Sequence, residues 1–559
     1  MTSIKNWAKG LYNRDTIKQD AVAGVVLGVE SVPDGLAGGL LAGVNPVFGL
    51  YGYLYGTLGG ALFTSATYMA VQATGAMAIV VADVPQVQGE SGERALFTLA
   101  IMTGAVMLVA GLFKLGSLLR WVSNSVMVGF INAVGINIIL GQLDNFTGYE
   151  AEGANRLLRA FDTLLHLGQA HWGSILIGVA TIGLIVALER SKLGPLGMVV
   201  AIVATSTAVV VFGMDVAQLR GLTEVPGQLP WITLPDLGAA PSLIIPALAL
   251  AFVGLVQGAG ISAGMPNPDG EFPDASQDFI GQGAGNVASG FFSGMPVGGS
   301  MSASSLVKGA GAKSKLALIV ASGVMASIIL LLSGAVGYIA MPALAALLML
   351  VGYRTIKPGD IKAVWRTGAT QATVMSVTFV LTMIIPLQNA VMVGIGISVI
   401  LFVIKQSNRM TLKRWVPDEG GRRMKEVDPP TEVGVDEVII LQPYGSLFFA
   451  SAPVFDEELP DVLPESSNSV VIIRLRGKTD LGTTFMDVLA RYAYALRSQD
   501  CKLMITYADD KVSDQLVVTG ARAALGEENI YESDEWLGAT VRRANENATK
   551  WISDNRRSD

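Results

Sequence analysis

Apolar segments follow one another from Ala21 to Ile404 with only short interruptions. A helix that spans a lipid bilayer needs about 20 mostly apolar residues. The chain of 559 residues is 51% hydrophobic and 15% charged, which is typical of a helical protein that crosses the membrane many times. We count fourteen spanning segments, several of them short or rich in glycine, centred on Gly28, Leu54, Met77, Met107, Gly135, Gly178, Val203, Leu250, Ala284, Ser304, Ala326, Leu347, Val377 and Gly396.

An even number of spans places both chain ends on the same side of the membrane. Basic residues flank the first and the last span, so the positive-inside rule predicts that both termini are cytoplasmic. We expect the protein to lie in the inner, cytoplasmic membrane. Residues 1–20 are charged and amphipathic and lack the features of a cleaved signal peptide, so we expect them to remain at the membrane surface. The flanking basic residues are Lys5, Lys9, Arg14, Lys18, Lys405, Arg409, Lys413 and Arg414.

The character of the chain changes at Lys405. We expect a transmembrane domain over 21–404, a linker over 405–432 and a small α/β domain over 433–559. In that domain the pattern predicts strands at 437–451, 469–477 and 502–508, and helices at 483–499 and 513–526. Alternating strands and helices indicate a sheet flanked by helices. The end of the chain, from Ala548 on, is expected to be frayed.

Two spans are interrupted at corresponding positions of the two sevenfold halves. The third reads "MAVQATGAMA" and the tenth reads "PVGGSMSASS". A broken helix at mid-membrane offers free N–H groups and a positive helix end, which suit an anion. Packing of small residues between helices would use the same amino acids. The predicted anion site comprises Gln72, Thr74, Gly75 and Ala76 from the third span and Gly299, Ser300, Met301 and Ser302 from the tenth.

Two carboxylates lie within the first span. Glu30 and Asp34 are four residues apart, and hence on one helix face, on either side of Pro33. A carboxyl group removed from water favours its protonated form, so either residue could carry a proton together with the anion. Alternatively, they face a wet vestibule or bond to the backbone of a broken helix. Asp83, near the far end of the third span, is expected to be a solvated interfacial residue.

Other classes of function find little support. The single cysteine, Cys501, excludes an intrachain disulfide, and two histidines do not make a zinc centre. We expect no metal, no cofactor and no enzymatic activity. The net charge of -7 argues against nucleic acid as a partner.

Several motifs together resemble one family. "VPDGLAGGLLAGVNPVFGLYGYLYGTLGG", "FINAVGINIILGQLDNFTG" with Gln142, and "QDFIGQGAGNVASGFFSGMPVGGSMSASS" are similar to segments of the SulP sulfate permeases. "SLFFASAPVF" and "VVIIRLRGKTDLGTTFMDVLARYA" resemble the STAS domain of that family. The resemblance spans almost the whole chain. It implies fourteen transmembrane helices in two inverted repeats of seven, as in uracil permeases, with a core domain that moves against a gate domain, and usually a homodimer.

The resemblance implies secondary transport of a small anion by an elevator motion, with the first helix lining the site. Gln257 occupies a position where many members carry a carboxylate, which makes sodium coupling less expected, and Ala303 stands where many carry an arginine. Sulfate, bicarbonate, chloride, nitrate and small dicarboxylates all remain open as substrates. Proton symport, sodium-coupled bicarbonate uptake, anion exchange and an uncoupled channel remain open as modes, as does a signalling protein without transport.

STAS domains resemble bacterial anti-sigma-factor antagonists, in which a serine or threonine after an aspartate is phosphorylated. The matching loop holds Asp480, Thr483 and Thr484, so these threonines are regulatory candidates. A structural reading is that Asp480 only caps the next helix. Dimerisation and binding of a regulatory protein are the roles we expect of this domain.

Overall fold

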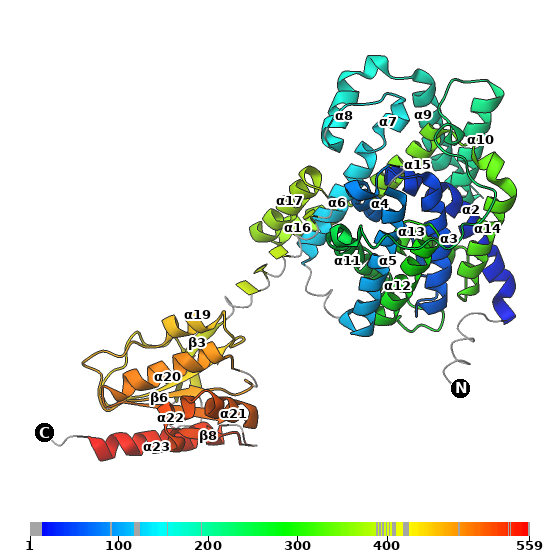
Figure 1. Cartoon of the computed structure of the whole chain (residues 1–559). Helices are drawn as coiled ribbons and strands as arrows, with labels where there is room; N and C mark the ends of the chain where they lie inside the picture. Colours follow the sequence, from blue (N-terminus) through cyan, green and yellow to red (C-terminus); the bar gives the residue numbers. More distant parts are fainter. Residues whose placement is uncertain are drawn as a thin grey trace. The chain divides into compact units, whose positions relative to one another are not determined.

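The computed structural model divides the chain into two compact units, residues 1–398 and 399–559 (Figure 1). It describes residues 14–556 except 90–91, 117–122, 154, 192, 387–388, 391–392, 394–395, 398–399, 402, 405–409, 418–423, 479–480, 535 and 537. Six described helices are by themselves long and apolar enough to cross a bilayer: Arg14–Leu41, Glu93–Leu112, Asn124–Thr147, Trp172–Glu189, Ala240–Gly264 and Leu316–Val336. The other spanning segments are shorter helices or are broken.

The first half of the helical unit begins with a long helix, a shorter helix and a broken span. Pro33 lies inside the first helix, and Asn45 caps the second with its side chain. The elements are α2 (Ile17–Leu41), α3 (Pro46–Phe63), β1 (Ala70–Gln72), α4 (Gly75–Ala82), α5 (Glu93–Leu112), α6 (Asn124–Leu140), α7 (Leu143–Thr147), α8 (Arg156–Leu165), α9 (Trp172–Glu189) and α10 (Gly197–Val211).

The second half repeats this order. It contains α11 (Ala240–Gly264), α12 (Ala275–Phe291), β2 (Gly298–Ser300), α13 (Met301–Gly309), α14 (Leu316–Val336), α15 (Met341–Thr355), α16 (Pro358–Thr367) and α17 (Ala369–Ile384), and the described residues from 389 to 404 are helical. Each predicted centre falls within a helix. The predicted fold class, with its two repeats and broken third and tenth spans, is confirmed.

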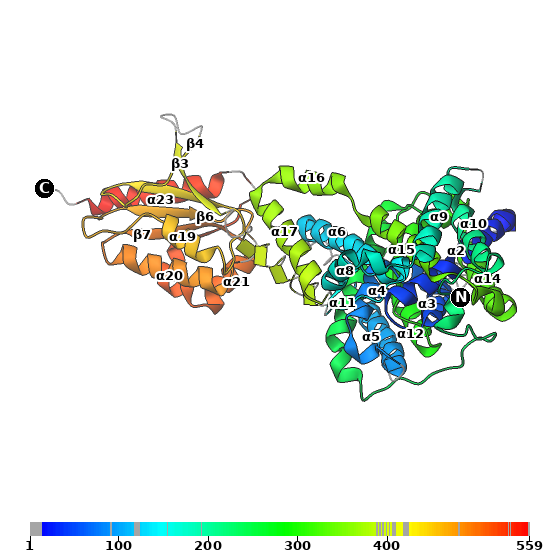
Figure 2. The same cartoon turned by 90° about the horizontal axis from the view of Figure 1, so that it is seen from above.

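The helices form two groups. In the core group, α2, α3, α5, α11, α12 and α14 pack on one another around the broken spans, while in the gate group α6 and α9 pack against α15, α10 against α9, and α17 against α6 (Figures 1 and 2). Glycines allow the close approaches within the core. A Cβ on Gly49 would lie 2.1 Å from the carbonyl oxygen of Gly35, so this crossing of α3 over α2 requires glycine.

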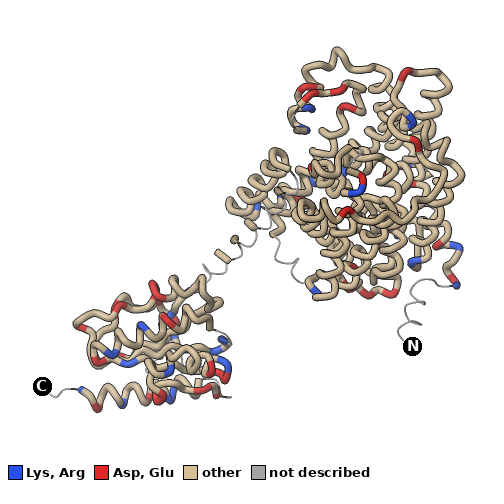
Figure 3. Tube along the Cα trace, viewed as in Figure 1, with Lys and Arg blue, Asp and Glu red and all other residues tan. Residues whose placement is uncertain are grey.

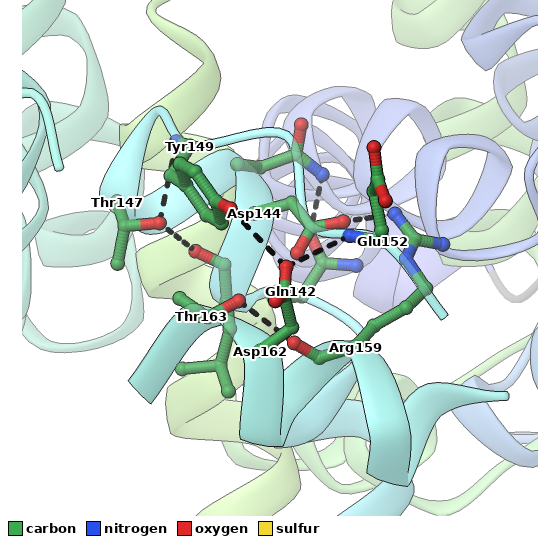
Figure 4. Close-up of polar contacts among 10 residues, drawn as sticks. Gln142, Asp144, Thr147, Tyr149, Glu152, Arg159, Asp162 and Thr163 are labelled. Atoms are coloured by element: carbon green, nitrogen blue, oxygen red, sulfur yellow. Dashed lines mark hydrogen bonds and ion pairs between the residues drawn. The ribbon is translucent and has the colours of Figure 1, made fainter. Parts of the chain in front are cut away.

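A short amphipathic helix, α8, lies in the connection between the gate helices α6 and α9. Its polar side is held by contacts within the connection, as Figure 4 shows: Tyr149 OH donates to Asp162, the Glu152 N–H donates to the same carboxylate, and Arg159 pairs with Asp144. The backbone N–H bond at Glu152 holds the pKa of Asp162 below its ordinary value. The position of α8 is therefore fixed by its polar face.

The C-terminal unit is a six-stranded mixed sheet with helices on both faces. Its strands lie in the order β4-β3-β5-β6-β7-β8, with β5 to β8 parallel and β3 antiparallel to both of its neighbours. The strands are β3 (Thr411–Pro417), β4 (Met424–Val427), β5 (Val438–Tyr444), β6 (Val470–Arg474), β7 (Lys502–Ala508) and β8 (Ile530–Glu532). The helices are α19 (Ala452–Glu458), α20 (Thr483–Arg497), α21 (Asp510–Val518), α22 (Ala521–Leu525) and α23 (Ala539–Asn555).

Four sequence predictions for this unit are wrong. The strand expected at 437–451 ends at Tyr444. The expected linker, 405–432, contains β3 and β4, and β3 pairs with β5, so part of it belongs to the sheet. The helix expected at 513–526 is two helices, because Gly520 adopts a positive φ of 74° between them. The end expected to fray is helical to Asn555 and buries Ala548 and Ile552 against the sheet.

Charge is distributed unevenly between the units. Lysine, arginine, aspartate and glutamate are sparse over most of the helical unit and frequent over the C-terminal unit (Figure 3). This contrast fits a lipid-embedded unit followed by one that is exposed to water.

Candidate functional site

The two broken spans meet in a short antiparallel ribbon. β1 pairs with β2 through Ala70 opposite Ser300, Val71 opposite Gly299 and Gln72 opposite Gly298. All six residues are buried. Because the strands run in opposite directions, α4 and α13 leave the ribbon from opposite ends. The first turns of both helices therefore lie beside the same ribbon in the middle of the core.

Each half-helix begins with a hydroxyl cap. The Thr74 side chain accepts a hydrogen bond from the Met77 N–H, and the Ser300 side chain accepts one from the Ala303 N–H. A helix leaves its first N–H groups without intrahelical partners, and one cap satisfies one of them. The N–H groups of Gly75 and Ala76, and those of Met301 and Ser302, remain available to bind an anion.

The approach to α13 is held by side chains from α12. The Asn286 amide accepts from the Val297 N–H at 2.9 Å and donates to the Val297 carbonyl oxygen at 2.5 Å, and the Ser289 hydroxyl donates to the Met295 carbonyl at 2.6 Å. The Gly299 N–H donates to Gln282 Oε1 at 2.9 Å. This bond occupies the N–H of Gly299, and the role of Gly299 in anion binding stays a prediction.

The two predicted glutamines differ in their surroundings. Gln257 Oε1 accepts from the Thr74 hydroxyl at 2.9 Å and is half-buried, so α11 contributes directly to the start of α4. Gln72 is 1% exposed, and its amide donates to Ser31 Oγ at 2.9 Å. The Gln72 side chain thus joins β1 to α2, and its role as a ligand stays a prediction.

The two carboxylates of α2 also differ. Asp34 accepts from the Tyr53 hydroxyl at 2.7 Å, and the same hydroxyl lies 2.8 Å from the carbonyl oxygen of Ala73, directly before the Thr74 cap. Glu30 lies one turn earlier and is half-buried. The charged groups that act on it are Asp34 on the same helix and the ion pair between Glu189 of α9 and Arg354 of α15. The prediction for Asp83 is refined, because its side chain is 17% exposed and pairs with Arg156 at 2.9 Å.

One side of the start of α13 is not covered by other described residues. Met301 is 45% exposed and Ser302 is exposed as well, and the two hydroxyls of Ser300 and Ser302 lie 3.2 Å apart. Ala303, in contrast, is buried against α2 residues. The predicted residues Thr74, Gly75, Ala76, Gln257, Ser300, Met301 and Ser302 therefore surround the two helix starts, whereas Tyr53, Gln282 and Asn286 were missed.

The regulatory candidates lie at the beginning of α20. Thr483 and Thr484 are its first two residues, and Gly482 occupies the N-cap position without a side-chain cap. The expected capping by Asp480 concerns a residue that lies outside the described residues. Phosphorylation of either threonine stays a prediction.

Comparison with known proteins now identifies the family. Residues 17–378 match the model of the sulfate permease family, and residues 430–535 match that of the STAS domain. The chain belongs to the sulfate permease family. It is a multi-pass membrane transporter with a C-terminal STAS domain, not an enzyme.

Relatives of this family member extend along most of its length. The putative sulfate transporter YvdB of Bacillus subtilis is 24% identical over 94% of this chain and 98% of its own. The bicarbonate transporter BicA of Picosynechococcus is 25% identical over 79% of this chain and 83% of its own. The structure of the murine anion transporter Slc26a9 in its inward-facing state matches with a TM-score of 0.83 at 19% identity, over 97% of this chain and 94% of that one.

Proposed function

We propose that this sulfate permease family member is a secondary active transporter of a small inorganic anion. The observation that carries the proposal is the pair of half-helices, α4 and α13, which both begin at one buried ribbon. The first turn of each half-helix has two uncapped N–H groups. Four N–H donors and two positive helix ends form a site for negative charge without any fixed cation.

The substrate class follows from what surrounds the site. Hydroxyls of Thr74, Ser300 and Ser302 and the amide of Gln257 accompany the N–H groups, while Ala303 provides no positive charge. Such a set suits a small oxyanion. Sulfate and bicarbonate are the leading candidates, since relatives carry those names. Uptake of labelled sulfate and bicarbonate into proteoliposomes would test this, and transport of neither would count against it.

We further propose an elevator motion of the core group against the gate group. Arg156 of α8 bridges the two groups, because its Nη1 lies 2.9 Å from Asp83 Oδ1 and its Nη2 lies 3.4 Å from the Ile79 carbonyl oxygen near the end of α4. The Arg156 side chain is 19% exposed. This contact holds the half-helix of the core to the gate in the present conformation, and it has to break when the core moves.

Replacing Arg156 with glutamine should therefore ease the motion. A partly exposed ion pair contributes about 1 kcal/mol, so we expect the rate of labelled-anion counterflow in proteoliposomes to rise roughly fivefold. Arg159→Gln is the matched control, because Arg159 pairs with Asp144 inside the same connection and does not reach the core. Equal acceleration by both variants, or by neither, would show that the Arg156 contact does not restrain the core.

Proton coupling through Glu30 is the mode we propose for uphill transport. Glu30 is half-buried on α2, and Asp34 of the same helix is linked through Tyr53 to the residue before the Thr74 cap. Protonation of a carboxyl there would offset the charge of the incoming anion.

Glu30→Gln is expected to abolish accumulation driven by a proton gradient. A gradient of one pH unit corresponds to about 1.4 kcal/mol per proton, or a concentration ratio of about ten. That ratio should fall to the value for uncoupled equilibration, while counterflow, which needs no net proton movement, should persist. If Glu30→Gln and Asp34→Asn both keep proton-driven accumulation, these carboxylates do not couple transport. An anion current without coupled uptake would favour the channel alternative.

Assembly and orientation complete the proposal. We expect a homodimer with both termini cytoplasmic in the inner membrane, and a STAS domain that binds a regulatory protein. Crosslinking of the intact protein in its native membrane, together with protease access to the STAS domain from each side, would test the dimer and the orientation.

A further inference from the structure

Two arginines lie close together within the STAS domain and take no part in the proposed transport site. Arg474 ends β6, and Arg476 follows two residues later in the turn after the strand. Arg474 is 8% exposed, and its Nε and the Nη1 of Arg476 are buried without hydrogen-bond partners. Among the described residues neither guanidinium forms an ion pair with a carboxylate. Burial lowers the pKa of Arg474, and Arg476 acts in the same direction.

The ring of Tyr507 contacts both arginines, and the backbone of this residue is strained. Tyr507 has a φ of 62°, which is rare for a bulky residue, and the register of β7 against β8 shifts at this point. Its ring centroid lies 5.0 Å from the Arg474 guanidinium and 5.2 Å from that of Arg476. On the other side Arg474 stacks on Trp415 at 4.2 Å. Strain of this kind persists where surrounding structure maintains it, often at functional sites.

The same tyrosine connects the arginines to a helix end. Tyr507 OH accepts a hydrogen bond at 2.7 Å from the Gly538 N–H, and Gly538 is the N-cap of the 17-residue helix α23, which has no side-chain cap. The Thr506 hydroxyl beside it is buried and unpartnered. Two arginines, a free hydroxyl and the positive end of a helix thus converge at the carboxyl edge of parallel strands, where open α/β sheets bind their ligands.

Packing alone does not account for this arrangement. Stacking on aromatic rings and a 2.5 Å bond to Gln442 Oε1 occupy part of the Arg474 guanidinium. They leave its Nε and the Nη1 of Arg476 without acceptors, and unpaired buried donors are costly. The nearby carboxylate of Glu426 already accepts from Trp415 Nε1 at 3.0 Å and from Tyr444 OH.

We propose that this edge of the STAS sheet binds a small tetrahedral oxyanion, a sulfate or phosphate group, between Arg474, Arg476 and the start of α23. Guanidinium groups bind such groups through paired N–H donors, and a helix start adds backbone donors. The site would let the cytoplasmic domain respond to the concentration of an oxyanion. It does not depend on which anion the transmembrane domain carries.

Hydrogen exchange on the purified full-length protein distinguishes this site from the transport site, because peptides report on each separately. Sodium sulfate and sodium phosphate are compared with sodium chloride at equal ionic strength. We expect sulfate or phosphate, but not chloride, to protect the backbone around 474–478, 505–508 and 538–542. Arg476 is half-buried, so Arg476→Gln should leave the sheet intact while raising the Kd of this protection about tenfold or more.

Two further variants make the outcome decisive. Arg491→Gln removes an exposed arginine of α20 that pairs with Asp456, and it should leave the protection unchanged. Arg474→Lys keeps the charge but loses the planar donors, and it should weaken protection as Arg476→Gln does. The proposal is overturned if neither oxyanion protects these segments, if chloride protects them equally, or if Arg476→Gln binds as the native protein does.

Discussion

Replacing Asp278 with alanine is expected to destabilise the core group strongly. Asp278 of α12 is fully buried, and its carboxylate accepts from the Ser65 N–H at 2.6 Å, the Ala66 N–H at 2.9 Å and the Ser65 and Ser262 hydroxyls. These bonds fix the chain that leads into β1. Alanine would leave the Ser65 and Ala66 N–H groups without their acceptor and would remove a carboxylate that acts on the buried Lys315, at a cost of about 3 to 5 kcal/mol.

The apparent melting temperature of the detergent-purified protein measures this effect. Asp274→Asn is the matched control, because Asp274 is an exposed N-cap of the same helix and asparagine caps equally well. Asp278→Asn keeps one acceptor oxygen and should fall between the two. Equal melting of Asp278→Ala and Asp274→Asn would mean that the approach to β1 is held by other contacts.

Much of the candidate anion site could be predicted from the sequence, because its chemistry lies in two short stretches. Glycine, proline and hydroxyl residues inside apolar runs mark broken helices, and their matching positions indicated two half-helices that meet at one site. The ribbon between them and the caps Thr74 and Ser300 were not predicted. The supporting residues could not be predicted in this way. Gln282 and Tyr53 act from other helices, and no local pattern shows that the Gln282 amide binds the Gly299 N–H.

The C-terminal unit shows a different limit. β3 lies in a basic segment after the last span, and only its pairing with β4 and β5 shows that it is a strand. The apolar residues of α23 are few, so the sequence shows only a weak pattern of an amphipathic helix. Ala544 and Ala548 are nevertheless fully buried against the sheet. In both places tertiary packing, rather than local preference, determines the structure.

The second large effect is expected at Ser300, where a change of charge can be separated from a change of fold. Serine, aspartate and asparagine are all favourable N-caps, so Ser300→Asp and Ser300→Asn should both preserve α13. Aspartate, however, places a negative charge at the start of the helix, where the anion would bind. At a separation of about 5 Å the repulsion is about 3 kcal/mol, which corresponds to roughly a 100-fold increase in Kd.

The Kd of the transported anion for these two variants tests the central claim most directly. It is measured by equilibrium binding to the purified full-length protein, and the melting temperature checks that each variant folds. All variants also carry Arg476→Gln, which removes the proposed site in the STAS domain. The account predicts that Ser300→Asp melts at or above the native temperature yet binds roughly 100-fold more weakly, while Ser300→Asn stays within about tenfold of the native Kd. Native affinity in a well-folded Ser300→Asp protein would contradict an anion site between the starts of α4 and α13.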